Sequence, residues 1–132
     1  MNRGREQALL FLRKAANDEG LLDAVIHSAT VSDDVFGFHC QQAAEKLLKA
    51  LLSKLQVGFR RTHDLKYLMD LLADAGEPLP TRFDDLKELN FFAVEFRYDD
   101  VPSEVKLDRP VTRQKLRELR SYVESNICPS SA

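Results

Sequence analysis

Hydrophobic residues recur every three or four positions along most of the chain, which is the spacing of one face of an α-helix. The pattern is widest between Ser32 and Leu55, where two apolar rows run along the same segment. One row holds Phe36, Cys40, Ala43, Leu47, Leu51 and Leu55, and the other holds Ala44, Leu48 and Leu52. A stripe this wide leaves little surface for solvent, so we expect this helix to be central and mostly buried.

Further helices are predicted on both sides of this central one, with glycines, prolines and capping residues at their ends. They cover residues 5–17, 18–29, 63–75, 82–96 and about 112–126. Ser32, Thr62 and Thr112 are the expected N-caps of the third, fourth and last helices. No strand pattern is present in the sequence. We therefore expect an all-α fold, an up-and-down antiparallel bundle of four main helices plus shorter ones.

The composition is that of one ordinary globular domain. The chain has 132 residues, of which 44% are hydrophobic and 30% charged, so we expect a single domain over residues 1–132. Residues 127–132 are expected to fray. No apolar run is long enough to span a bilayer, and the charged N-terminus is unlike a signal peptide. We expect a cytoplasmic protein without membrane contact.

The net charge of −2 hides two basic blocks. Residues 45–66 contain six lysines and arginines against two acids, and residues 106–120 contain six more, while the segment between them is acidic. This bipolar pattern favours a specific anion or partner over general coating of nucleic acid. The alternative is that both blocks are solvated helix faces.

Known catalytic and metal-binding patterns are missing from the sequence. No Glu-x-x-His pair or Gly-rich phosphate loop occurs, and the three histidines lack ligand spacing. We therefore expect no metal and no other cofactor. Cys40 is predicted to be a small core residue and Cys128 an exposed thiol.

Three groups of polar residues are candidates for a binding site. His39, Gln42, Lys46 and Lys49 share one face of the central helix, which lines either a groove or the solvated side of the bundle. Arg61 and His63 lie beside the N-terminus of a predicted helix, where an anion is favoured, although capping alone also explains this segment. Arg97 is suited to phosphate and Tyr98 to stacking, or both residues serve local structure.

Residues 41–46 (QQAAEK), 62–65 (THDL) and 97–98 (RY), in this order, resemble the landmarks of the HEPN family. The resemblance covers nearly the whole chain. It implies a helical bundle, commonly a homodimer, and in many members a partner that is a minimal nucleotidyltransferase, often as a toxin–antitoxin pair. Some members are proposed to bind nucleotides, and the toxin members are metal-independent ribonucleases.

One departure from the family pattern weighs against catalysis. The ribonuclease members carry a His four to six residues after the Arg, whereas Val101, Pro102 and Ser103 stand there after Arg97. We therefore expect a non-catalytic nucleotide- or nucleic-acid-binding subunit. Its predicted binding residues are Arg97, Tyr98, His63, Lys46, Lys49 and Arg61. The alternatives are an RNA-cleaving toxin that uses Arg97 and His63, and a dimeric interaction subunit without a ligand.

Overall fold

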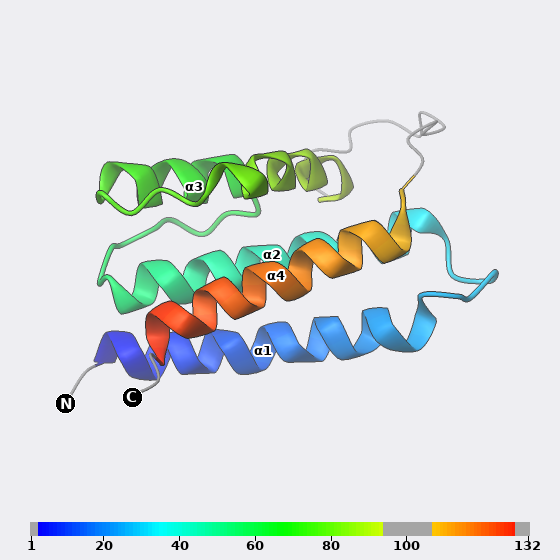
Figure 1. Cartoon of the computed structure of the whole chain (residues 1–132), viewed down its shortest axis with the longest axis horizontal. Coiled ribbons are helices and arrows are strands. Elements are labelled where there is room, and N and C mark those ends of the chain that lie inside the picture. The colour runs from blue at the N-terminus through cyan, green and yellow to red at the C-terminus, as the bar shows by residue number, and fades with distance from the viewer. Residues whose placement is uncertain (1–2, 94–106, 129–132) are drawn as a thin grey trace.

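The computed structural model describes residues 3–93 and 107–128, in which all regular structure is helical (Figure 1). The elements are α1 (Arg3–Val25), α2 (Asp33–Lys54), α3 (Leu65–Asp74), the 3₁₀ helix η1 (Thr81–Phe92) and α4 (Arg109–Ile127). The helices α1 and α2 run antiparallel, and α4 lies beside them, antiparallel to α1 (Figure 1). The helices α3 and η1 cover another side of α2, which confirms the predicted all-α bundle.

The central position of α2 is confirmed. It contacts α1, α3, η1 and α4, and nearly all of its apolar side chains are buried. Ser32 caps its N-terminus as predicted, because the Ser32 side chain accepts a hydrogen bond from the Val35 amide. Cys40 is fully buried, and this burial raises the pKa of its thiol to about 12, as expected for a packing residue.

The two helices predicted over residues 5–17 and 18–29 are one continuous helix, α1, which ends at Val25. The predicted break between them was wrong because Asp18 does not begin a new helix: its side chain points at α2, where the carboxylate contacts His39 and Lys46. The next residue, Glu19, bonds Arg113 and Arg120 of α4. These contacts keep the chain helical at Gly20, although glycine in a helix lowers stability by about 1 kcal/mol relative to alanine.

The predicted caps of α3 and α4 were also wrong. Asp64, not Thr62, caps α3 by accepting the Tyr67 amide, while the Thr62 hydroxyl accepts the Asp64 amide. Asp108 caps α4 through the Val111 amide, so that Thr112 lies inside the helix. The helix begins before the predicted residue 112 and includes Pro110, because proline fits the first turn of a helix, where its missing N–H has no partner to lose.

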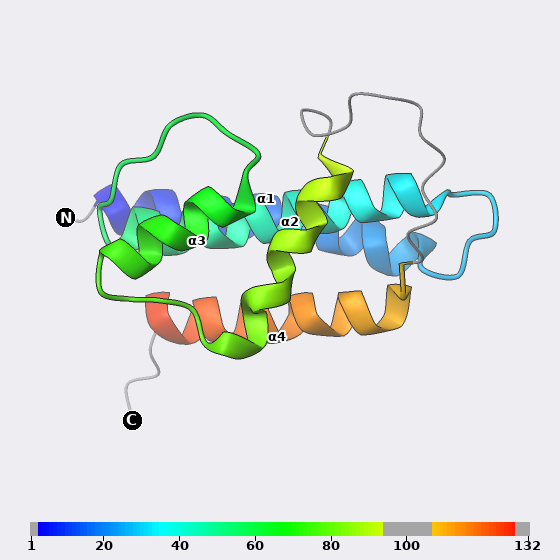
Figure 2. The ribbon, with the colours of Figure 1, turned by 90° about the horizontal axis from the view of Figure 1, so that it is seen from above.

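The segment predicted as an α-helix over residues 82–96 is η1, which crosses the long helices obliquely (Figure 2). Its buried residues Phe83, Leu86, Leu89 and Phe92 recur at every third position. That spacing aligns side chains on one line at three residues per turn, as in a 3₁₀ helix, whereas an α-helix would rotate them apart. Residues 94–96 lie outside the described residues.

Ion pairs join α4 to α1, and one of them, between Arg113 and Glu19, is buried at both ends. Arg113 Nε lies 2.6 Å from Asp23 Oδ1, and Arg120 Nη2 lies 2.6 Å from Glu19 Oε2. Arg109 donates to carbonyl oxygens of the α1–α2 connection and to Asp33. The arginines of the second basic block therefore attach one helix to another rather than forming only a solvated face. Ile127, which is buried at the end of α4, had been assigned to the frayed tail.

Candidate functional site

A buried carboxylate on α2, that of Glu45, organises the polar residues on this side of the molecule. Its side chain is 5% exposed, with Oε1 2.7 Å from His63 Nδ1 and Oε2 2.8 Å from Lys49 Nζ. The Gln41 amide also donates to Oε1 at 3.3 Å. A buried charge is tolerated only when it is paired and hydrogen-bonded, and these three partners meet that requirement.

The connection between α2 and α3 is held against α2 by hydrogen bonds to its backbone. Gln41 Nε2 donates to the His63 carbonyl at 2.6 Å, and Lys49 Nζ donates to the Thr62 carbonyl at 3.3 Å. These bonds fix the backbone of His63, while 46% of its side chain stays exposed. With a carboxylate at Nδ1, the favoured tautomer carries its proton on that nitrogen. The imidazole is therefore oriented by Glu45 at the protein surface.

A second buried carboxylate, that of Asp18, lies between α1 and α2. It accepts hydrogen bonds from Lys46 Nζ and pairs with His39 Nδ1 at 3.0 Å. The polar residues predicted to share one face of α2 thus pair with two different acids. His39 and Lys46 pair with Asp18, and Lys49 pairs with Glu45. Because both lysines already have partners, a phosphate would compete with these carboxylates for them. Their predicted contact with a ligand stays a prediction.

The arginines before α3 differ in their surroundings. The Arg60 guanidinium lies 3.8 Å from the centre of the Tyr67 ring, and the Arg60 amide donates to the Tyr67 hydroxyl. Arg61, the predicted phosphate ligand, is exposed. At the N-terminus of α3, Asn90 accepts the Leu65 amide and Asp64 accepts the Tyr67 amide. These two amides are therefore already hydrogen-bonded within the protein. The exposed side chains of Arg60 and Arg61 can still attract an anion.

Arg97 and Tyr98 lie outside the described residues, so the structure does not place these two predicted site residues. The described part of the site instead contains two polar residues, Gln41 and Glu45, that were not among the predicted site residues. Gln41 and Glu45 interrupt the second apolar row of α2, since they precede Leu48 at the same helical spacing. Polar residues in a buried row usually have partners, and that signal could have identified both.

A comparison with protein families assigns the fold. The family model for the HEPN domain matches residues 6–128 of the chain. The chain belongs to the HEPN domain family. Comparison with curated proteins and with solved structures finds no match.

The structure explains why two landmarks of this HEPN domain occur together. Residues 41–46 lie on α2 and residues 62–65 lead into α3. Gln41 and Glu45 of the first landmark bond the backbone and the ring of His63 in the second. The two landmarks therefore form one hydrogen-bonded unit.

The described residues of this HEPN domain include no group of three or more His, Cys, Asp and Glu side chains arranged to hold a metal ion. None of the described helices has both the length and the apolar character needed to cross a bilayer.

Proposed function

We propose that this HEPN domain is a nucleotide- or nucleic-acid-binding subunit that acts as a homodimer with a nucleotidyltransferase partner and has no catalytic activity of its own. The supporting observation is the His63 ring, which Glu45 holds in a defined orientation while nearly half of it is exposed. Arg60 and Arg61 lie on the same connection. Histidine and arginine side chains suit phosphate oxygens and nucleobases, so this surface fits an anionic, partly aromatic ligand.

Each residue has an expected part in this site. His63 and Arg61 contact phosphate or base directly, because their side chains are exposed. Lys49 is only 12% exposed and acts mainly by compensating the charge of Glu45, which would otherwise repel a phosphate. Lys46 compensates the charge of Asp18 in the same way. Arg97 is assigned to phosphate and Tyr98 to stacking, on the basis of the family pattern.

Calorimetric titration of ATP, GTP and a short single-stranded RNA tests this proposal. We expect binding by the wild-type protein, loss of binding in His63→Ala and Arg97→Ala, and unchanged binding in His27→Ala. His27 is an exposed histidine in the α1–α2 connection and serves as the matched control. No heat with any ligand, together with loss of the dimer in Arg97→Ala, would instead favour an interaction subunit without a ligand.

The pairing of His63 with Glu45 supports a second candidate function, the cleavage of RNA. A carboxylate that orients an imidazole is a recurring arrangement for general acid–base catalysis. Incubating RNA with the wild-type protein in EDTA tests this candidate, with His63→Ala and Arg97→Ala as controls. Cleavage that both variants lose would establish RNA-cleaving activity at this site. Intact RNA with the wild-type protein would contradict this second candidate.

A further inference from the structure

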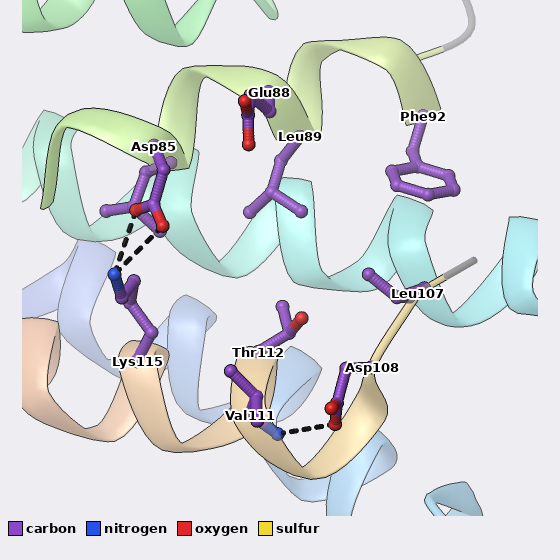
Figure 3. A pocket seen from close by; sticks show the side chains of 10 residues that line it. Asp85, Glu88, Leu89, Phe92, Leu107, Asp108, Val111, Thr112 and Lys115 are labelled. Atoms are coloured by element: carbon purple, nitrogen blue, oxygen red, sulfur yellow. Dashed lines mark hydrogen bonds and ion pairs between the residues drawn. The ribbon is translucent and has the colours of Figure 1, made fainter. Parts of the chain in front are cut away.

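A groove lies between η1 and α4 (Figure 3), and its described lining residues include none of the His63 site. It has a volume of about 230 Å³. Leu89 and Phe92 enter it from η1, Leu107 from the residues just before α4, and Val111 from the first turn of α4 (Figure 3). Val111 is 61% exposed and forms the apolar wall of the groove on the α4 side. The interior of the groove is thus apolar and accessible at its α4 side.

Acidic side chains surround this apolar interior. Asp85, Glu88 and Asp108 line the groove together with one cation, Lys115. Lys115 Nζ lies 2.9 Å from Asp85, and Asp108 accepts the Val111 amide (Figure 3). Glu88 makes no hydrogen bond or ion pair with any side chain in the described ranges, 3–93 and 107–128. Among the described residues that line the groove, three carboxylates against one ammonium leave two excess negative charges.

Charge and size together restrict what can occupy the groove. Its negative potential repels phosphate, so it does not suit the nucleotide proposed for the His63 site. Its volume is below the roughly 300–1,000 Å³ of pockets that enclose drug-sized ligands, and suits a side chain of a longer segment. An apolar side chain would fill the interior, and a neighbouring cation would meet Glu88 at the edge.

We propose that this groove binds a segment of a partner protein in which an apolar side chain stands next to a lysine or arginine. The inference is independent of nucleotide binding, because a different side of η1 faces the His63 region. There, Asn90 bonds Asp64 and the Leu65 amide of α3. Charge complementarity identifies the occupant, since the apolar wall alone would accept any hydrophobic chain.

The test uses fluorescence anisotropy with an array of labelled hexapeptides. Each peptide carries one Leu, Ile, Phe or Met beside one Lys or Arg, and a matched set has Glu in place of the cation. We expect members of the cationic set to bind the wild-type protein and the Glu set not to bind. Glu88→Lys should weaken binding by about tenfold or more, because it reverses the charge at the edge of the groove.

Two further variants separate this groove from general electrostatics. Asp84→Lys makes the same charge change on an exposed residue of η1 that does not line the groove, and should leave the affinity within about twofold. Val111→Ser removes the exposed apolar wall and should also weaken binding. Circular dichroism and thermal melting confirm that each variant is folded.

Three results would overturn the proposal. The first is that no cationic peptide binds the wild-type protein. The second is that Glu88→Lys and Asp84→Lys weaken binding equally, which would show attraction to overall charge. The third is that Glu88→Lys dissociates a dimer and peptides do not bind, which would assign the groove to contact between two copies of the chain.

Discussion

Glu45 and Asp18 show how single buried acids organise the polar side of this HEPN domain. Each carboxylate is nearly inaccessible, and each pairs with one lysine and one histidine. The pairs fix residues from different elements in one arrangement, since Asp18 belongs to α1 and His63 to the connection before α3. A buried ion pair adds little net stability compared with apolar packing, but losing one member is costly.

Replacing Glu45 by alanine should destabilise the protein by about 3 kcal/mol, because Lys49 would lose its carboxylate while remaining mostly buried. Urea unfolding monitored by circular dichroism measures the change. Glu118→Ala, which removes an exposed acid of α4, should change the free energy of unfolding by less than about 0.5 kcal/mol. Equal effects of the two substitutions would contradict the structural role assigned to Glu45.

At Ser53, in contrast, we expect a substitution by alanine to stabilise the protein. Its hydroxyl is buried and has no hydrogen-bond partner among the described residues. Replacing Ser53 by alanine removes this unsatisfied group and favours the helix, so we expect a stabilisation of about 1 kcal/mol. The same urea measurement tests this, and a destabilised Ser53→Ala would mean that the hydroxyl has a stabilising partner.

At the level of elements, the apolar spacing predicts which segments are helical, but not always their type or their ends. The central helix could be predicted from its two apolar rows and its Ser32 cap. The strict three-residue spacing of Phe83, Leu86 and Leu89 indicates a 3₁₀ helix, although it was interpreted as an α-helix. The continuity of α1 could not be predicted, because contacts of Asp18 with distant residues outweigh its local preference for a cap.

The crossing of η1 over α2 depends on Gly37. A Cβ atom added at Gly37 would lie 2.4 Å from the Phe92 ring, so Gly37→Ala must displace that ring. We expect a loss of about 1–3 kcal/mol in the free energy of unfolding. Gly20→Ala is the matched control, because a Cβ at Gly20 meets nothing within 4 Å. That substitution should stabilise α1 by up to about 1 kcal/mol, and a similar loss in both variants would contradict the close packing at Gly37.

The stability that the ion pair between Arg113 of α4 and Asp23 of α1 provides should depend on pH. The hydrogen bond from Arg113 holds the pKa of Asp23 below its ordinary value of 3.8. A carboxyl with a lowered pKa stabilises the folded state above its unfolded pKa, and this contribution disappears as pH falls through the lowered value. Urea unfolding at several pH values should therefore show a wild-type advantage over Asp23→Asn that is constant near neutral pH and shrinks below 3.8. An advantage that persists at the lowest pH would contradict this account.

For the whole molecule, the sequence predicts the family and fold more completely than the site. The landmarks on α2 and before α3 are short runs of residues that can be recognised directly in the sequence, and they bond each other in the structure. The partners of His39 and Lys46 come from α1, more than 20 residues away, and no local pattern reveals such pairing. Arg97 and Tyr98, which belong to the predicted site, lie outside the described residues, so their roles stay predictions.

The most direct test of the proposed function follows the ring nitrogens of His63 by NMR during titration with ATP and a short RNA. The account predicts that the His63 signals shift with saturating behaviour and keep the signature of an Nδ1 proton bonded to Glu45, while the His27 signals do not move. Titrations in which calorimetry detects binding but His63 is unaffected would contradict a ligand site at this residue. No binding and no shift would contradict nucleotide or RNA binding by this domain.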